Sequence, residues 1–379
     1  LAHPMGRVVI FHVPARTSGT AYHYDGSYLM RSGENLLPMS QDQMRKIFAE
    51  GQPDFLSGIA LADASSDDVI GLLDTQSYFD LMNLPYPVDR SGVLSRLESE
   101  KLILSRDGLH GITNLGAVLF AKNLADFPTV WRKAPRVVVY DGTGKLKTKI
   151  DKLIVQGYAV GFAALVEFVV GQTKHNEVVG KALRVNLKMF PERAIRELVA
   201  NALIHQDFEV TGASVMVEVY DDRLEISNPG KPAIPPDRFI DEYRSRNERL
   251  ADVMRRLGVC EEKGSGIDQV VFSAEMFQLK PPDFRVGEVR TTAVLFAHQE
   301  FDDMETEDRI RACYQHCCLR YVMNQKMSNE SLRDRFKLPK SKSESASRII
   351  QAALGRSLIK PDDPEKVSKR YAKYVPFWA

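Results

Sequence analysis

PERAIRELVANALIHQDF, residues 191–208, is the stretch of sequence that decides the fold of the central part of the chain. Its apolar residues follow the i, i+3, i+4, i+7, i+8 spacing of an amphipathic helix, and they are Ile195, Leu198, Val199, Ala202 and Leu203. Pro191 and Glu192 suit a first helical turn, where a missing N–H costs nothing and a negative charge meets the positive end of the helix dipole. The stretch therefore predicts a helix with one face in a core.

A second line of side chains, spaced by four, lies roughly opposite the apolar stripe: Arg193, Glu197, Asn201 and His205. Residues four apart lie one above the other on a helix. Asparagine is a poor residue for the middle of a helix because its amide competes for backbone hydrogen bonds. A carboxylate one turn before an amide could hold a hydrated Mg²⁺ against phosphates and orient a water molecule. The alternative is an ordinary solvent-facing stripe.

Length and charge bound the function. The 379 residues are too many for one ordinary core, so we expect two to four domains. The formal net charge is +1, so any nucleic-acid site must be a local basic patch. Four cysteines do not suggest a disulfide framework in a chain of this length, and a reducing cytoplasm is expected. The longest apolar run, residues 154–170, is too short and too polar to span a bilayer. The sequence begins without Met, and we expect that a preceding segment is missing.

Turn residues and apolar runs outline the first third of the chain. Residues 7–14 (RVVIFHVP) predict a buried strand, and Asp25-Gly26 predicts a hairpin followed by a helix at residues 40–51. Short helices and a small hairpin at Asp107-Gly108 follow between residues 67 and 122. Helices followed by a hairpin suggest a winged-helix-like unit, which we interpret as a structural connector rather than a DNA reader. A long helix is expected at residues 151–171.

Two further motifs follow the opening helix. A strand ends abruptly at Asn228-Pro229-Gly230, and Gly264-Ser265-Gly266 opens another helix. Glycines let backbone N–H groups approach an anion, and a helix N-terminus contributes its positive end, so the second motif could cradle phosphates. Each motif alone could be a simple turn. Their order after a Glu/Asn helix is more specific than any one of them.

With these motifs in place, residues 191–277 resemble the GHKL (Bergerat-type) ATPase fold, in the divergent branch of RecG-like C-terminal, ATP-binding regions of transcriptional regulators. The words that carry the resemblance are RELVANALIHQDF, DDRLEISNPG, RNERLADVMRRLG and EKGSGI. The resemblance implies that Glu197 is the general base and that Asn201 holds Mg²⁺ bridging the phosphates. The other implied pocket residues are Asn228 and Gly230 on the adenine side, Gly264, Ser265 and Gly266 around the phosphates, and His205 and Asp207 flanking the pocket.

The chain departs from the GHKL pattern at the base-binding position. GHKL ATPases carry an Asp in an Asp-x-Gly-x-Gly word, whereas this chain has Asn228 in Ser-Asn-Pro-Gly. An amide oxygen still accepts a hydrogen bond but carries no charge. The glycine-rich lid is also reduced to one Gly-x-Gly, so the enzyme activity is expected to be at most a weak Mg²⁺-dependent ATPase. No P-loop word, Gly-x4-Gly-Lys-Ser/Thr, occurs in the sequence, which argues against a helicase motor.

The N-terminal residues 6–40 resemble the second half of the AlbA-like DNA-binding domain that Schlafen proteins also carry. The words VVIFHVPA and AYHYDGSYLMRSGEN carry this resemblance. It implies that Arg31 contacts nucleic acid; the alternative is a hairpin arginine that is merely solvated.

Positive charge gathers near the C-terminus. Residues 343–354 read as a recognition helix and residues 366–373 as a wing, and cationic or short polar residues there suit phosphate and groove contacts. The expected DNA-binding residues are Lys340, Lys342, Arg348, Lys369 and Arg370. The alternative is a helical bundle with an exposed basic face. Cys313, His316, Cys317 and Cys318 match no zinc spacing and are interpreted mainly as buried core residues.

These observations predict an α+β, multidomain protein. Residues 1–60 would be a partial AlbA-like module, residues 61–130 a winged-helix-like connector, residues 131–300 a GHKL α/β sandwich, and residues 301–379 a winged-helix-like DNA-binding domain. The leading hypothesis is a cytoplasmic bacterial transcriptional regulator in which ATP and Mg²⁺ control contacts with DNA or dimerisation, without a membrane partner. The alternatives are a DNA-stimulated ATPase of a nucleic-acid-processing or phage-defence system, and a structural module with a vestigial pocket.

Overall fold

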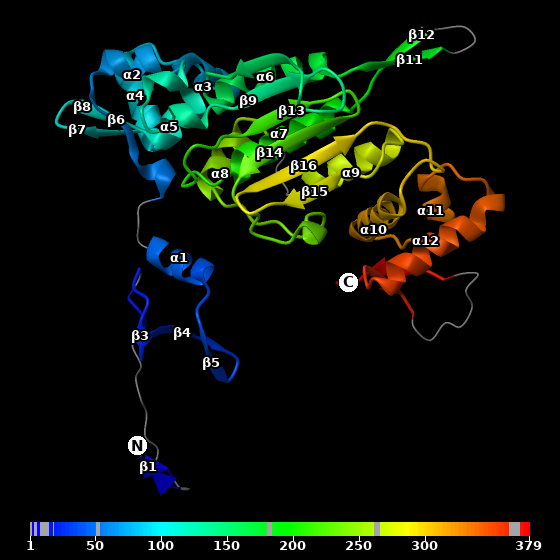
Figure 1. Ribbon diagram of the computed structural model, residues 1–379. Helices are drawn as coiled ribbons and strands as arrows, with labels where there is room; N and C mark the ends of the chain where they lie inside the picture. The colour runs from blue at the N-terminus through cyan, green and yellow to red at the C-terminus, as the bar shows by residue number, and fades with distance from the viewer. Residues whose placement is uncertain are drawn as a thin grey trace. The chain divides into compact units, whose positions relative to one another are not determined.

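The chain folds as a mixed α+β, multidomain protein (Figure 1). The computed structural model describes residues 2–3, 6–7, 15–17, 19–50, 54–179, 184–260, 266–363 and 372–379. Two compact units separate between Gly58 and Ile59. The finer division into four parts remains a prediction. Among the described residues, no helix combines the length and the apolar character that crossing a bilayer requires.

The first unit contains a small antiparallel sheet and one helix. Its sheet has the order β3-β4-β5, with bounds His23–Tyr24, Ser27–Ser32 and Asn35–Pro38, and helix α1 covers Gln41–Ala49. The hairpin predicted at Asp25-Gly26 is confirmed: both residues have positive φ, 48° and 75°, as a two-residue hairpin turn requires. Two short strands, β1 (Ala2–His3) and β2 (Gly6–Arg7), pair near the N-terminus. The strand predicted at residues 7–14 lies, beyond Arg7, outside the described residues.

The second unit begins with a module of short helices and a three-stranded sheet, which we call the connector module (residues 59–130). Its elements are β6 (Ile59–Ala64), α2 (Ser66–Leu72), α3 (Thr75–Leu81), α4 (Arg90–Ser99), β7 (Ile103–Arg106), β8 (Leu109–Thr113) and α5 (Asn114–Phe120). The sheet order is β6-β8-β7, so the first strand pairs with the last. Positive φ values at Asp107 and Gly108 confirm the predicted hairpin turn. Helix α5 is buried along its whole length.

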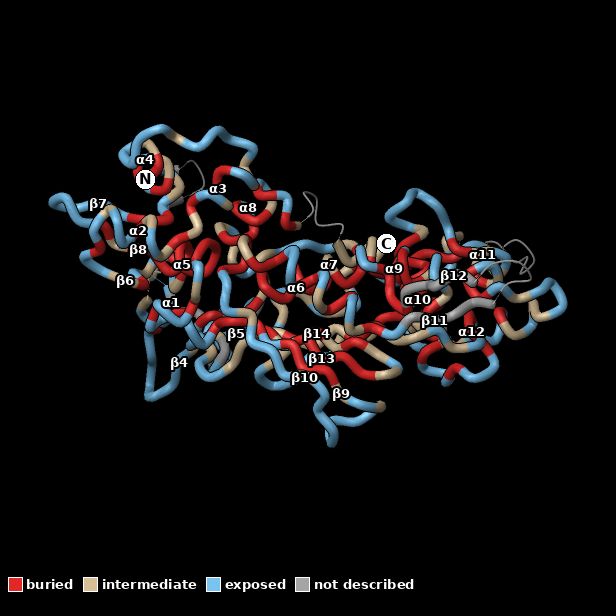
Figure 2. Tube along the Cα trace, turned by 90° about the horizontal axis from the view of Figure 1, so that it is seen from above, coloured by how far each residue is buried: buried red, intermediate tan, exposed pale blue. Residues whose placement is uncertain are grey.

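A six-stranded sheet forms the centre of the second unit. Its order is β10-β9-β13-β14-β16-β15, with bounds Thr148–Leu153, Arg136–Tyr140, Met216–Val219, Arg223–Pro229, Arg290–Phe296 and Asp283–Val286. Only the β9–β13 pair is parallel. Helices α6 (Tyr158–Gln172), α7 (Glu192–His205) and α9 (Gly266–Met276) lie along one face (Figure 1). Figure 2 shows the buried residues concentrated in the central strands and in α5.

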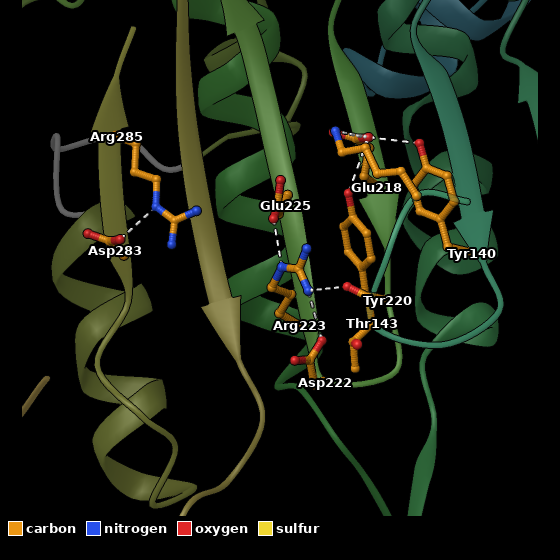
Figure 3. A network of polar contacts seen from close by, with 10 residues as sticks. Tyr140, Thr143, Glu218, Tyr220, Asp222, Arg223, Glu225, Asp283 and Arg285 are labelled. Carbon is orange, nitrogen blue, oxygen red and sulfur yellow. Dashed lines mark hydrogen bonds and ion pairs between the residues drawn. The ribbon is translucent and has the colours of Figure 1, made fainter. Parts of the chain in front are cut away.

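The opposite face of the sheet carries a network of paired polar side chains (Figure 3). Side chains alternate between the two faces of a strand. Arg223 and Glu225 therefore lie on one face of the sheet, and the buried Leu224 lies on the other. Arg223 Nε donates to Glu225 Oε1 at 2.7 Å. In the neighbouring strands Tyr140 Oη donates to Glu218 Oε1 at 3.0 Å, and burial together with this carboxylate raises the pKa of Tyr140 to about 12. This face therefore satisfies its own polar groups.

One predicted element is wrong. The helix expected at residues 151–171 begins only at Tyr158, and Thr148–Leu153 is instead the edge strand β10, paired with β9. The apolar periodicity belongs to residues 158–170 alone, whereas β10 supplies a hydrogen-bonding partner for β9. Gly157 is the N-cap of α6. A Cβ there would lie 2.5 Å from the carbonyl oxygen of Leu119, so this position requires glycine.

Helix α7 confirms the prediction made from its apolar stripe. It runs from Glu192 to His205, with Pro191 as N-cap, and its apolar residues are buried between α6, α9 and β14. Before it, strands β11 (His175–Val179) and β12 (Arg184–Lys188) pair as an arm that projects from the body in Figure 1. After β14, residues 231–247 form an irregular stretch that we call the lid segment. It contains only the short turn Pro236–Arg238 and leads into α8 (Glu248–Arg256).

The C-terminal module (residues 301–379) contains α10 (Thr306–Val322), α11 (Asn329–Arg335), α12 (Ser343–Gly355) and the pair β17 (Ile359–Pro361) and β18 (Tyr374–Pro376). Its core also includes Ile240 of the lid segment and Val271 of α9. Cys313, Cys317 and Cys318 are buried in this core, where burial raises the pKa of each thiol. Their burial confirms the interpretation of these three cysteines as core residues. Within the described part of the chain, no group of three or more His, Cys, Asp or Glu could hold a metal ion.

Candidate functional site

A pocket opens between α7, β14, the start of α9 and the lid segment. Helix α7 contributes Glu197, Asn201 and His205, the polar line predicted from the sequence. These residues are four apart, so the line extends over about 12 Å of helix at 1.5 Å per residue. Glu197 is only 4% exposed. A carboxylate so deeply placed costs free energy unless it has partners, so the line is not an ordinary solvent-facing stripe.

The start of α9 lies directly against this line. A Cβ added at Gly266 would lie 2.8 Å from Glu197 Oε2 and 3.3 Å from Asn201 Nδ2. Any larger residue would therefore push into the carboxylate and the amide. Gly266 brings the N-terminal end of an eleven-residue helix to the two polar groups, and that end attracts negative charge. The preceding residues Gly264 and Ser265, predicted to wrap phosphates, lie outside the described residues.

Asn228 lies in the pocket at the end of β14. Its Nδ2 donates to the carbonyl oxygens of His205, at 3.4 Å, and Pro229, at 3.1 Å. Since both carbonyls accept from the amide nitrogen, the amide oxygen is the group left to face the pocket. Asn228 is therefore oriented as a hydrogen-bond acceptor, as an Asp at this position would be, but without charge.

Gly230, two residues after Asn228, packs closely against Asp207. Gly230 has φ 94°, and a Cβ there would lie 2.6 Å from Asp207 Cβ. The Asp207 amide donates to the carbonyl oxygen of Pro229 at 2.9 Å, and Thr291 Oγ1 donates to that of Gly230 at 2.8 Å. These contacts join the end of β14 to the residues that follow α7. Gly230 therefore acts through close backbone packing rather than as part of the pocket wall.

The lid segment adds pocket residues to which the sequence assigned no role. Arg246 Nη1 donates to Asp207 Oδ2 at 3.0 Å, and Arg246 Nη2 donates to the carbonyl oxygen of Lys231 at 2.6 Å. The neighbouring Asn247 donates through Nδ2 to the carbonyl oxygens of Ile204 and Gln206. The other pocket residues of the lid segment are Pro232, Ala233, Ile234, Phe239, Glu242, Tyr243 and Arg244. Their periodicity is irregular, so only the fold could bring them to the pocket.

The pKa values of His205 and Cys260, two titratable side chains in the pocket, are shifted by their surroundings. Burial, with the positive charge of Arg246, lowers the pKa of His205 to about 4, so its imidazole is neutral at pH 7. The His205 ring lies edge-on to Tyr243, with 6.2 Å between ring centroids. Burial and the nearby Glu197 raise the pKa of Cys260 to about 11. A protonated thiol is a poor nucleophile, so Cys260 is a wall residue rather than a reactive one.

The predicted DNA-binding residues belong to the first unit and to the C-terminal module. Arg31 is exposed in the first unit and donates through Nε to the carbonyl oxygen of Gly33 at 3.1 Å. In the C-terminal module, Lys340 is exposed, Lys342 pairs with Asp302 at 2.7 Å, and Arg348 lies 3.9 Å from Glu344. The charge of Lys342 is thus partly neutralised within the protein. Lys369 and Arg370 lie outside the described residues.

Part of the pocket lies in a segment that matches a known family. Residues 212–295 match the family model described as "Putative ATP-dependent DNA helicase recG C-terminal". No curated protein matches the chain. The crystal structure of the DIP2311 protein from Corynebacterium diphtheriae is similar in fold, with a TM-score of 0.53 at 16% sequence identity over 92% of this chain and 70% of that chain. The matched segment holds β13, β14, the lid segment, α8 and α9, and these residues therefore form an ATPase-like domain similar to the C-terminal region of RecG.

Proposed function

We propose that this chain binds ATP with Mg²⁺ in the pocket between α7, β14, α9 and the lid segment, in a domain of the GHKL type. Nucleotide binding would control its contacts with DNA or the pairing of two copies, as in a transcriptional regulator. The observation that carries the proposal is the contact of Glu197 and Asn201 with Gly266, which begins α9 within the ATPase-like segment 212–295.

The donor set at this contact suits Mg²⁺. Mg²⁺ prefers oxygen ligands, keeps several waters and is usually held by one or two protein groups together with phosphate oxygens. Asn201 would supply the amide oxygen, and Glu197 would orient a water molecule. When bound, the ion would offset the negative charge of the phosphates. The missing side chain at Gly266 leaves the space that this arrangement needs.

The neighbouring modules support a regulatory role because both touch elements of the pocket. Helix α9 begins at Gly266 in the pocket, and its Val271 is part of the core of the C-terminal module. Helix α8, which follows the lid segment, is joined to the connector module through Arg256 and Glu100. A ligand that orders the lid segment could therefore change how both modules are held.

The DNA-binding part of the proposal rests on the C-terminal module and, by sequence resemblance, on the first unit. Lys340 and Arg348 are exposed cations beside and on α12, and Arg31 is an exposed cation in the first unit. Such residues would contact phosphates and make binding depend on salt. Pairing of two copies is proposed from the GHKL resemblance alone.

Calorimetry with ATP, ADP and GTP, with and without Mg²⁺, tests the proposal. We expect ATP to bind in a Mg²⁺-dependent way and Asn201→Ala to abolish the Mg²⁺ dependence. Glu197→Ala should keep binding and remove any hydrolysis. Arg193→Ala is the matched control, because Arg193 belongs to the same line of α7 but not to the described pocket lining. Unchanged ATP affinity in Asn201→Ala would overturn the assignment.

A further inference from the structure

Arg246 places a guanidinium group in the pocket in a fixed orientation. Two of its N–H groups are used within the protein, one on the carboxylate of Asp207 and one on the carbonyl oxygen of Lys231. An arginine has five N–H donors, so the remaining three can serve a ligand. The side chain is 35% exposed, which leaves it accessible from the pocket that it lines.

The line of polar residues on α7 tells which end of a nucleotide Arg246 would meet. In the proposed function the phosphates lie at Asn201 and Gly266. His205 is one helical turn further on, about 6 Å along the axis, and Asp207, which binds Arg246, follows it directly. Arg246 therefore lies at the end of the pocket away from the phosphates, on the same side as Asn228.

Asp207 ties Arg246 and Asn228 to the same piece of backbone. The Asp207 amide donates to Pro229, the residue after Asn228. The other carboxylate oxygen of Asp207 accepts from the amide of Glu209 at 3.0 Å, which fixes the rotation of the carboxylate. The donor group of Arg246 and the acceptor oxygen of Asn228 are consequently held at one site, although they come from different segments.

A donor beside an acceptor distinguishes purine bases. One edge of adenine carries an amino donor next to a ring-nitrogen acceptor, whereas the same edge of guanine carries two acceptors. Adenine can therefore pair with both Asn228 and Arg246. Guanine would leave the oxygen of Asn228 facing another acceptor, which is unfavourable when both groups are desolvated.

We infer that Arg246 is a specificity-determining residue that contacts the base of the bound nucleotide, and that Asp207 is the residue that positions it. The inference rests on the proposed function of the pocket. It assigns a role to Asp207, for which the sequence suggested only a place beside the pocket.

The test is calorimetry on the full chain with ATP, GTP and inorganic tripolyphosphate, each with Mg²⁺. We expect Arg246→Gln to weaken ATP binding by about tenfold, because a hydrogen bond to a charged group is lost, and to reduce the preference for ATP over GTP. Tripolyphosphate has no base, so its affinity should not change, and this result also shows that the variant is folded. Arg246→Lys should recover part of the affinity.

Asp207→Asn should change ATP binding in the same direction and by less, and combining it with Arg246→Gln should weaken binding no further than Arg246→Gln alone. Arg244→Gln is the matched control, since it removes the same charge from the lid segment without a described partner at Asp207. We expect it to affect ATP and tripolyphosphate equally.

Three outcomes would overturn the inference. Arg246→Gln could leave ATP affinity unchanged, or weaken tripolyphosphate as much as ATP, which would make Arg246 a phosphate contact. Arg244→Gln could also reproduce the ATP-specific loss. Each differs from a failure of the proposed function, in which the unaltered chain binds no ATP or Asn201→Ala has no effect.

Discussion

The connector module and the C-terminal module both contain helices followed by a hairpin, but their third helices have different surroundings. In each, two or three helices are followed by a hairpin, and the first strand position pairs with the last. This pairing joins β6 to β8 in the connector module and Met327 to Tyr374 in the C-terminal module. A winged-helix-like architecture of the two modules remains a prediction.

The end of α4 in the connector module makes a polar contact with α8. Glu100 accepts from both Nη atoms of Arg256, at 2.9 and 2.7 Å, and its carbonyl oxygen accepts from Arg249 at 2.8 Å. The Glu100 side chain is 13% exposed. Hydrogen bonds from Arg256 hold the pKa of Glu100 below its usual range. The third helix of this module therefore binds α8 rather than remaining available for DNA.

The C-terminal module shares an apolar core with the domain, to which α9 contributes Val271 and the lid segment contributes Ile240. Its third helix, α12, keeps an exposed outer face that includes Arg348. Apolar burial is difficult to reverse without unfolding, whereas a bidentate ion pair can be released by competing charges. The comparison indicates that the contact between α4 and α8 can be released by competing charges. Both modules also keep apolar contacts with the domain, through α5 and α6 in the connector module and through the shared core in the C-terminal module.

The largest effect is expected from breaking the shared core. Val271→Asp should lower the free energy of unfolding by about 4 kcal/mol or more, because it buries an unpaired charge. Thermal or denaturant unfolding measures this change. Phe272→Asp, at the neighbouring position, is the control, since the Phe272 side chain is 41% exposed. It should lower the free energy of unfolding by about 1 kcal/mol or less. Equal effects of the two substitutions would contradict a shared core.

Breaking the polar contact should have a smaller effect. Glu100→Gln should cost about 2 kcal/mol, between the values typical of exposed and of buried ion pairs, and limited proteolysis should then cleave faster beside the contact between α4 and α8. Asp252→Asn removes the other, half-exposed partner of Arg256 and should cost less than about 1 kcal/mol. Because the folded-state pKa of Glu100 is lowered, its contribution is present above pH 4.5 and is lost as pH falls further. A Glu100→Gln variant as stable as the parent chain would make this contact dispensable.

The opposite pH dependence is expected beside the C-terminal attachment. Burial and the nearby Asp241 raise the pKa of Asp268, on α9, to about 7. The folded state then holds a proton that the unfolded state releases above about pH 4, so stability decreases as pH rises from about 4 to 7. Asp268→Asn should remove this decrease, and melting temperatures between pH 5 and 8 should diverge increasingly from those of the parent chain. Parallel melting curves would show that Asp268 does not titrate in this range.

The smallest effect concerns DNA. If α12 is the available helix, Lys340→Gln and Arg348→Gln should each reduce the salt dependence of duplex binding by about one phosphate contact. Arg106→Gln, at the exposed hairpin of the connector module, should leave it unchanged. Titration of a labelled duplex at several salt concentrations gives the slopes. An effect of Arg106→Gln equal to that of Lys340→Gln would reverse the roles assigned to the two modules.

Features encoded within a few residues could be predicted from the sequence. The apolar stripe of α7 follows from helical spacing, and the turns at Asp25-Gly26 and Asp107-Gly108 follow from the positive φ that such turns need. The Glu197 and Asn201 pair and the end of β14 were also predicted, and the structure brings them to one pocket. Strand β10 was missed because its identity depends on pairing with β9, which local periodicity does not reveal.

The sequence by itself determined the helix, the turns and the chemical groups of the candidate site, because each depends on the conformational preferences of neighbouring residues. Only the tertiary structure decided which residues of the lid segment line the pocket, that Asp207 holds Arg246 across 39 positions of sequence, and which module keeps its third helix exposed. These features depend on contacts between segments far apart in the chain. Such contacts form only when burial of apolar surface brings the segments together, and no local pattern specifies the partner.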